Sequence, residues 1–336
     1  MLHCFLKLRY YLLTAFLLGI LYVLSLPASP PPALALASSN HLLHQTPCLE
    51  ADLFQGHWHL GAGSASAPFT LGQWVPAQHA CYPSPAPSLR SLCTGRKVAL
   101  VGDSVSRYLA IDLAVALFDC SLGWNGASCE GAASASASPV CSQLHSYACH
   151  EKKHESLHLE GSGGTTLTFV WVTVAEALTH DSFRSLLADA TWDAILVSLG
   201  MWDVAVKTEG SLSVAHHCGW MHSHVKEVLE SALGAHQGLQ HRLRFWQPPF
   251  TEPANNNHVR IPHSDMATVN ECSRHAFPGS MYTNTTAMLS APAEAFSALL
   301  SARAALLTME GYHPTMQVRA VLLQALLQAV LSPLHT

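Results

Sequence analysis

From Lys97 onward, short apolar runs alternate with longer stretches whose hydrophobic positions repeat at helical spacing. The short runs are rich in β-branched and aromatic residues, which is typical of strands covered on both faces. Strands are predicted at 97–101, 167–174, 193–199 and 242–247, and helices at 105–118, 181–190, 220–235, 286–308 and 315–331. This alternation predicts an α/β domain in which helix layers enclose a mostly parallel sheet.

Two stretches do not follow this alternation. Residues 48–93 contain aromatic residues, prolines and three cysteines but no long periodic run, so we expect an irregular lead-in braced by disulfides. Residues 120–165 are rich in Gly, Ser, Ala, Cys and His, and this composition predicts a long loop near the functional site.

The N-terminus carries an uncharged, mostly apolar run from Tyr10 to Leu26, preceded by Lys7 and Arg9. A signal-anchor would span a thin bilayer here, whereas a cleaved signal peptide would use the small residues near 35–37. The run is longer than a usual signal-peptide core, which favours the anchor. The expected organisation is a cytosolic tail (1–9), a transmembrane anchor (10–26), a stem (27–47) and a lumenal catalytic domain (48–334). Both interpretations place the bulk of the chain in the secretory lumen.

The ten cysteines agree with an oxidising compartment. Nine of them follow the predicted anchor, and their spacings match no zinc-ribbon pattern, so disulfides are predicted. An odd number leaves at least one unpaired or bonded to another chain. Four lie close together and predict local bridges: Cys120, Cys129, Cys141 and Cys149. The glycosylation sequon Asn284-Thr285-Thr286 is consistent with the same compartment.

Composition and missing motifs exclude several classes of function. Only 12% of residues are charged, the net charge is -5, and no basic patch indicates nucleic-acid binding. A P-loop, a GxGxxG motif and an Asp-x-Asp motif are all absent, which argues against nucleotide cofactors and against the usual metal-dependent Golgi glycosyltransferases. The histidine-rich stretch with His216, His217, Cys218, His222 and His224 fits no known ligand set, so we expect no metal site.

The residues Gly102-Asp103-Ser104-Val105-Ser106-Arg107 follow a predicted strand and precede a predicted helix. Such a strand–turn–helix places the Ser104 hydroxyl at the C-terminal edge of a sheet, beside a helix N-terminus. Unpaired N–H groups and the helix dipole favour negative charge there, as a nucleophilic serine needs when its attack on an ester creates an oxyanion. A serine at this position is also a common helix N-cap. The lipase-type Gly-x-Ser-x-Gly elbow is absent.

A second motif, Glu310-Gly311-Tyr312-His313-Pro314, stands just before the last predicted helix. In a parallel α/β sheet such a turn can lie at the same edge as Ser104. A serine nucleophile needs a base and a carboxylate that orients it, which are the roles open to His313 and Glu310.

With these two motifs the chain resembles the PC-esterase group of the SGNH superfamily. That group includes the plant trichome-birefringence-like polysaccharide O-acetyltransferases and the animal sialic-acid O-acetyltransferase. The block 102–107 matches its GDSxxR motif, and Glu310-x-x-His313 is similar to its Asp-x-x-His motif. Residues 52–58 are similar to the segment that opens the plant domain, and the anchor and stem match the topology of Golgi members. The resemblance implies a three-layer α/β/α, flavodoxin-like domain with a mostly parallel sheet.

The resemblance also implies an acyl-serine mechanism. Ser104 attacks an acetyl donor, His313 takes its proton and later activates the acceptor hydroxyl, and the Ser104 N–H contributes to the oxyanion hole. Arg107 lies one helical turn beyond Ser104, so its side chain could reach the site, although a solvated helix arginine is the alternative. The resemblance implies that five residues surround the oxyanion and the substrate: Gly102, Asp103, Arg107, Gly200 and Trp202.

The chain departs from the family at two places. Glu310 stands where the family has Asp, and its extra methylene loosens the geometry toward His313. Trp202 occupies the Asn position of the Gly-x-Asn-Asp block, here Gly200-Met201-Trp202-Asp203. Its indole N–H could donate to an oxyanion, although a packing role is the more common one for a Trp after a strand. Three glycines stay open as the second oxyanion-hole residue: Gly123, Gly126 and Gly163.

These features predict a single-pass type II Golgi enzyme that transfers an acetyl group to a hydroxyl of a glycan or polysaccharide. No bound cofactor is expected, and acetyl-CoA or another acyl donor would be the co-substrate. A carbohydrate or lipid esterase with the same triad is the first alternative, and a catalytically inactive glycan-binding protein is the second. A secreted protein is the alternative to the membrane-anchored one.

Overall fold

The computed structural model describes residues 56–64, 67–76, 89–120, 122, 138–149, 155–204, 213–248, 263–285 and 316–331. The predicted tail, anchor and stem (1–47) lie outside these residues, as does the predicted helix at 286–308. None of the helices in the described part of the chain has both the length and the apolar character needed to span a membrane.

A six-stranded sheet forms the centre of the domain, in the order β4-β5-β3-β6-β7-β8. Neighbouring strands are parallel except for β4, which runs antiparallel to β5 at one edge. In chain order the five parallel strands stand as 2-1-3-4-5, which is a doubly wound arrangement. The strands are β3 (Lys97–Gly102), β4 (Leu157–Glu160), β5 (Thr166–Trp171), β6 (Ala194–Ser198), β7 (Leu243–Trp246) and β8 (Tyr282–Thr283).

The central strands are buried on both faces, which explains their nearly continuous apolar sequences. In β3, Val98 and Leu100 contribute to one hydrophobic cluster, while Ala99 and Val101 contribute to the cluster on the other face. This alternation with a period of two follows from the pleat of the strand. The four strands predicted from the sequence are therefore confirmed, with β5 ending at Trp171 and not at residue 174.

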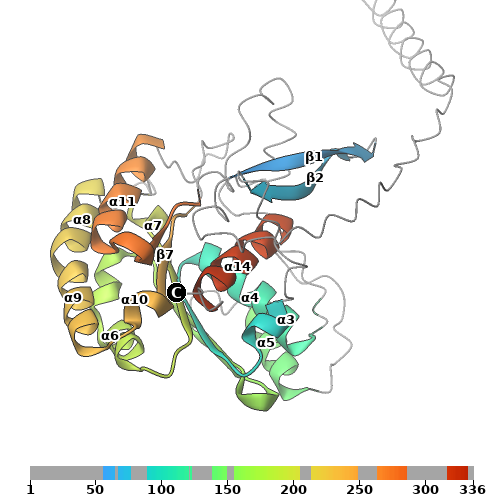
Figure 1. Cartoon of the computed structure of the whole chain (residues 1–336), viewed down its shortest axis with the longest axis horizontal. Helices are drawn as coiled ribbons and strands as arrows, with labels where there is room; N and C mark the ends of the chain where they lie inside the picture. Colours follow the sequence, from blue (N-terminus) through green and yellow to red (C-terminus); the bar gives the residue numbers. More distant parts are fainter. Residues whose placement is uncertain are drawn as a thin grey trace, which may run out of the picture. The chain divides into compact units, whose positions relative to one another are not determined.

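Helices cover both faces of this sheet (Figure 1), as the sequence predicted for an α/β domain. One face carries α3 (Leu89–Cys93), α4 (Ser104–Phe118), α5 (Pro139–Cys149) and α14 (Met316–Leu331). The opposite hydrophobic cluster includes residues of η2 (Ala175–Thr179), α6 (Asp181–Ala188), η3 (Met221–Val225), α9 (Lys226–Ala235), α10 (Leu239–Arg242), α11 (His263–Ala276) and η4 (Gly279–Met281). The remaining short elements are η1 (Ser162–Gly164), α7 (Met201–Val204) and α8 (Val214–Trp220).

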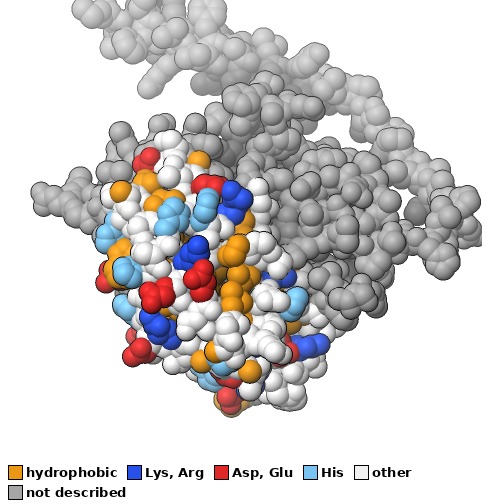
Figure 2. All heavy atoms as spheres, turned by 60° about the vertical axis from the view of Figure 1, so that its left-hand side comes forward, with side chains coloured by type: hydrophobic (Ala, Val, Ile, Leu, Met, Phe, Trp, Pro, Cys, Tyr) orange, Lys and Arg blue, Asp and Glu red, His pale blue; other side chains and the backbone are white. Residues whose placement is uncertain are grey.

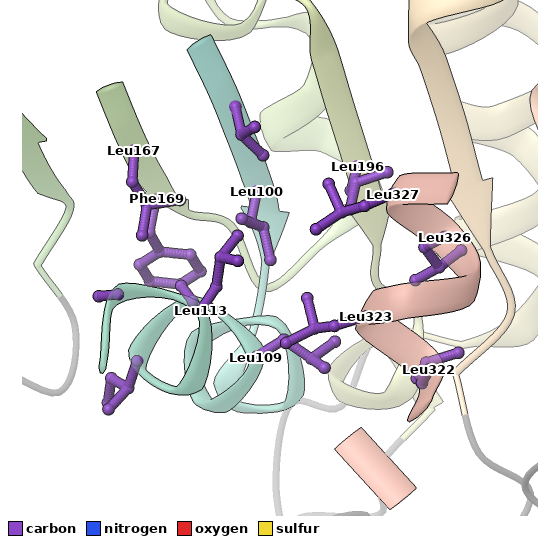
Figure 3. Packing of buried hydrophobic residues seen from close by; sticks show 14 of the residues in the cluster. Leu100, Leu109, Leu113, Leu167, Phe169, Leu196, Leu322, Leu323, Leu326 and Leu327 are labelled. Atoms are coloured by element: carbon purple, nitrogen blue, oxygen red, sulfur yellow. The ribbon is translucent and has the colours of Figure 1, made fainter. Parts of the chain in front are cut away.

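The helices α4 and α14 pack side by side through leucines (Figure 3). Leu323 of α14 faces Leu109 of α4, and Leu327 lies next to Leu196 of β6. A buried ion pair strengthens this contact, because the Arg319 guanidinium donates to the Asp112 carboxylate. The same guanidinium lies 5.4 Å from the centre of the Tyr108 ring. The first turn of α14 is thus fastened to the helix that begins at Ser104.

Several segments differ from the sequence prediction. Residues 120–165, predicted as a long loop, contain α5 and the edge strand β4. The predicted irregular lead-in contains an antiparallel hairpin, β1 (Gly56–Ser64) and β2 (Ala67–Pro76), whose frequent glycines and alanines obscure the strand alternation. The predicted helix at 220–235 begins earlier, at Val214, where the Ser213 hydroxyl caps it, and a π-helical turn (η3) interrupts it.

The predicted disulfides are present. Cys120 bonds to Cys141, which confirms a local bridge in the cysteine-rich segment, and Cys218 bonds to Cys272 across α8 and α11. Cys93 is a free, buried thiol, in agreement with the odd number of cysteines that follow the predicted anchor.

The Asp112–Arg319 ion pair is expected to stabilise the fold through an interaction energy that requires both residues. Arg319→Leu should lower the free energy of unfolding by about 3 kcal/mol, because Asp112 then loses its partner in a largely dry environment. The double variant Asp112→Leu/Arg319→Leu should recover part of that loss. Urea denaturation of the two single variants and the double variant tests the coupling, and additive losses would contradict it.

Candidate active site

Ser104 lies where β3 ends and α4 begins. The turn depends on Gly102, whose φ of 153° is unfavourable for residues with a side chain. A Cβ atom at Gly102 would lie 2.0 Å from the Ser198 carbonyl oxygen of β6 and 2.4 Å from the Ser106 Oγ. Only glycine allows the ends of β3 and β6 to approach this closely. This explains why a glycine is the first residue of the Gly-Asp-Ser block.

Asp103, and not Ser104, is the N-cap of α4. Its Oδ1 accepts a hydrogen bond from the Val105 N–H at 2.9 Å, and its backbone is extended. The interpretation of Ser104 as a helix cap is therefore wrong. Ser104 is the first residue of the helix and is partly exposed, whereas Asp103 behind it is 1% exposed. The cap and the candidate nucleophile are thus two adjacent residues with separate roles.

The turn after β6 lies at the same edge of the sheet. Because β3 and β6 are parallel neighbours, with Gly102 opposite Ser198, both turns begin side by side. Gly200 has a φ of 119°, and a Cβ atom there would lie 2.6 Å from Val269 Cγ1. The short helix α7 follows with Trp202, which is partly exposed. The structure therefore brings the Gly102–Ser104 turn next to the turn that carries Gly200 and Trp202.

This position is the topological switch point of the sheet. The chain leaves β3 through α4 on one face and leaves β6 toward η3 and α9 on the other. In open doubly wound sheets, ligands bind beyond the carboxyl ends of the strands at such a point. The strand order therefore singles out the same edge as the Gly-Asp-Ser motif.

Asp203 is a fully buried carboxylate that sequence reasoning left without a role. Its Oδ2 accepts hydrogen bonds from the Nδ1 of His217 at 2.5 Å and from the Ala175 N–H, which follows β5, at 3.2 Å. The Nε2 of His217 lies 3.3 Å from the hydroxyl of Ser273. The sequence held a signal for Asp203, because this residue is the last of the block Gly200-Met201-Trp202-Asp203 after β6. It held no such signal for its partner His217, which stands in the histidine-rich stretch.

The electrostatics of the edge follow from burial. Burial raises the pKa of Asp103 from 3.8 to about 7, and the Asp203 carboxylate adds to the rise. Among the described residues, neither Asp103 Oδ2 nor Asp203 Oδ1 has a hydrogen-bond partner. Two carboxyl groups are thus held close to the Ser104 turn, and at neutral pH a large fraction of Asp103 carries its proton.

Arg107 is buried, with 7% of its surface exposed, so the interpretation as a solvated helix arginine is wrong. It lies one turn beyond Ser104, and its guanidinium carbon is 5.1 Å from the centre of the Tyr108 ring. Its Nε atom is buried without a hydrogen-bond partner in the described structure.

Gly163 is not part of this edge. It belongs to η1, which connects the antiparallel strand β4 to the start of β5, and its carbonyl oxygen lies beside Gly95, just before β3. The starts of parallel strands lie at the edge opposite to Ser104, which removes Gly163 as an oxyanion-hole residue. Gly123 and Gly126 lie outside the described residues, and so do Glu310 and His313.

The histidine-rich stretch is divided between the core and the surface. The buried His217 side chain is hydrogen-bonded to Asp203, and Cys218 forms a disulfide. Over the described residues, no group of three or more His, Cys, Asp or Glu side chains is arranged to hold a metal ion. On the face that carries α8, α9 and α11, histidines lie dispersed among neutral and charged side chains (Figure 2).

The raised pKa of Asp103 predicts a pH-dependent stability. The folded protein holds this proton up to about pH 7, whereas the unfolded chain releases it near the ordinary pKa of 3.8. The folded state therefore binds more protons in this range, and the free energy of unfolding should fall as the pH rises from about 4 to about 7. Asp103→Asn, which cannot ionise but still caps a helix, should remove that part of the fall, as measured by urea denaturation across this range.

Asp189→Asn is the matched control for this experiment. Hydrogen bonds from Thr191 lower the pKa of the partly exposed Asp189 carboxyl, so it ionises below the critical range. This variant should keep the wild-type slope between about pH 5 and about pH 7. An unchanged slope in Asp103→Asn would show that Asp103 is ionised throughout.

Comparison with known protein families and with curated proteins finds no match to this chain.

Proposed function

We propose that this protein is a serine acyltransferase of the SGNH type that acetylates hydroxyl groups of a glycan or polysaccharide. The observation that carries the proposal is the position of Ser104, at the first residue of α4 and at the switch point of a doubly wound sheet. The strand order matches the flavodoxin-like order expected for an SGNH domain. The GDSxxR and acidic-x-x-His motifs add a chemical reason for choosing acyl transfer at this edge.

In the proposed first step, the Ser104 Oγ attacks the carbonyl carbon of an acetyl donor while His313 takes the hydroxyl proton. The tetrahedral oxyanion forms at the N-terminus of α4, where the Ser104 N–H and the helix dipole favour negative charge. Trp202, on the adjacent turn, is a second candidate donor through its indole N–H. The donor's leaving group departs with the proton from His313, and an acetyl-serine remains.

In the second step, His313 takes a proton from an acceptor hydroxyl, and the acceptor oxygen attacks the acetyl-serine. The ester bond to Ser104 breaks, the proton returns to Ser104, and the acetylated glycan leaves. Acetyl-CoA or another acyl donor would be the co-substrate. Glu310 would orient His313, and Arg107 would bind a negative group of donor or acceptor near the first turn of α4.

The anchoring of α14 supports the role of His313. Met316, where α14 begins, is the third residue after His313, and three extended residues span at most about 11 Å. Arg319, on the first turn of this helix, is paired with Asp112 and lies beside Tyr108, one turn after Ser104. A base carried just before α14 therefore belongs to a segment that leads directly into a helix fastened to α4.

The proposed setting is the Golgi membrane, with the predicted anchor at 10–26 and the catalytic domain in the lumen. The disulfides Cys120–Cys141 and Cys218–Cys272 support an oxidising compartment. Both the anchor and the lumenal orientation follow from the sequence and form part of the proposal.

The proposal is tested by trapping the acyl-enzyme. Incubation with an activated acetyl ester should add one acetyl group to Ser104, detectable by mass spectrometry of the intact protein. Ser104→Ala should abolish this adduct, and Ser104→Ala and His313→Ala should each lower ester turnover by about 10³-fold or more. Ser162→Ala, at an exposed serine of the opposite sheet edge, is the matched control and should retain full turnover.

Three other outcomes would change the conclusion. Full turnover in Ser104→Ala would show that Ser104 is not the nucleophile. Release of acetate, with no acetylated product in the presence of a glycan panel, would identify an esterase. Glycan binding without any acyl-enzyme would identify an inactive glycan-binding protein.

A further inference from the structure

A chain of hydrogen-bonded side chains runs through the core behind the turn that carries Gly200 and Trp202. Asp203 accepts from the Nδ1 of His217, and the Nε2 of His217 meets the Ser273 hydroxyl, which also lies 3.0 Å from the Val269 carbonyl oxygen. These contacts connect α7, α8 and α11. All three side chains are completely buried, so no substrate reaches them and they do not form a second catalytic triad.

The imidazole of His217 also packs directly against the turn. A Cβ atom placed on Gly200 would lie 3.4 Å from His217 Cε1. The ring therefore borders the space that a side chain at Gly200, two residues beyond the end of β6, would occupy. Because the same ring donates to Asp203, it holds the turn at both ends, at Gly200 by packing and at Asp203 by a hydrogen bond.

A disulfide joins α8 and α11 next to the contact between His217 and Ser273. Cys218 follows His217 in α8, Cys272 precedes Ser273 in α11, and the two cysteines are bonded with a Cα–Cα distance of 5.2 Å. The covalent link thus stands one residue from each partner of the His217–Ser273 contact. It fixes the separation of the two helices at the level where the imidazole must reach the serine.

Asp203 also connects two of the loops at the candidate active edge. Its Oδ2 accepts from the Ala175 N–H, so it ties the segment after β5 to the turn after β6. The Ser104 turn after β3 stands between these two segments, because β3 is flanked by β5 and β6 in the sheet. His217 is therefore linked through Asp203 to both segments that flank the Ser104 turn.

We propose that His217 is a positioning residue for the acyl-transfer site: with Asp203 and Ser273, and clamped by the Cys218–Cys272 disulfide, it fixes the turn Gly200–Asp203 in the geometry that stabilises the oxyanion. This inference rests on the function proposed above for Ser104. Misplacement of a stabilising group by about 1 Å costs on the order of 100-fold in rate. The group acts on the transition state, so its loss should lower kcat while KM stays nearly unchanged.

Two substitutions of His217 separate its two hydrogen bonds. The amide nitrogen of Asn stands near the place of Nδ1, whereas that of Gln reaches the place of Nε2. His217→Asn should therefore keep the Asp203 bond and retain kcat within about fivefold of the wild type, while His217→Gln should lower kcat by about 10- to 100-fold. The rates are measured with the activated acetyl ester on the full-length chain and expressed per folded enzyme.

The disulfide offers a matched pair of variants. Cys218→Ala/Cys272→Ala should lower kcat in the same direction as His217→Gln. Cys120→Ala/Cys141→Ala removes a bridge on the other face of the sheet and should leave the kcat of the folded enzyme unchanged. Leu229→Ala, at a buried leucine of α9, controls for a general loss of core stability.

Hydrogen–deuterium exchange gives a readout that does not depend on turnover. The amides of 200–204 should exchange faster in His217→Gln than in Leu229→Ala, which should resemble the wild type. Wild-type exchange and wild-type kcat in His217→Gln would overturn the inference while Ser104→Ala remains inactive. Full turnover in Ser104→Ala would instead overturn the proposed function, and faster exchange would then still show that His217 holds the turn. If His217→Gln does not fold, the Cys218→Ala/Cys272→Ala variant provides the same comparison.

Discussion

The close approach of β3 and β6 at Gly102 is the physical constraint on which the candidate site depends. A single methyl group at this position would lie 2.0 Å from the Ser198 carbonyl oxygen and would separate the two strand ends. With glycine, the strands remain paired up to Gly102 and Ser198, so the turns that follow start at the same height. One turn leads into α4 and the other into α7, and this places Ser104 beside the Gly200–Asp203 turn.

At the C-terminal ends of β3 and β6 the buried side chains change from apolar to acidic. Inside the sheet, Val98–Val101 and Ala194–Val197 bury only apolar side chains, whereas Asp103 and Asp203 are buried directly beyond the strand ends. Burying a carboxyl group is costly unless hydrogen bonds compensate it. Asp103 obtains one from the N-terminus of α4, and Asp203 obtains two, from His217 and Ala175. Buried carboxyl groups at the C-terminal ends of the strands, where doubly wound sheets bind ligands, are typical of functional sites.

The sequence predicted the elements that have a strong local signal. The strands β3, β5 and β6 and the helices α4 and α14 were found because their apolar positions are continuous or repeat with a clear period. The helix α11 was missed because its inward face is made partly of small or polar residues such as Cys272, Ser273 and Ala276. The strand β4 was missed because it has four residues and only two of them, Leu157 and Leu159, point into the core. In both, the signal is too short or too weak to stand out from a loop.

The sequence by itself determined the local geometry of Ser104. An apolar run, a glycine, polar residues that favour a helix N-cap and a helical stretch specify a strand–turn–helix, because each of these preferences acts over a few neighbouring residues. Only the tertiary structure decided which groups stand next to that serine. The order of the strands placed the Gly200–Asp203 turn beside it and moved Gly163 to the opposite edge, and the packing of α8 against α11 joined Asp203, His217 and Ser273. These choices depend on contacts between residues far apart in the chain, and hydrophobic periodicity contains no information about which distant elements become neighbours.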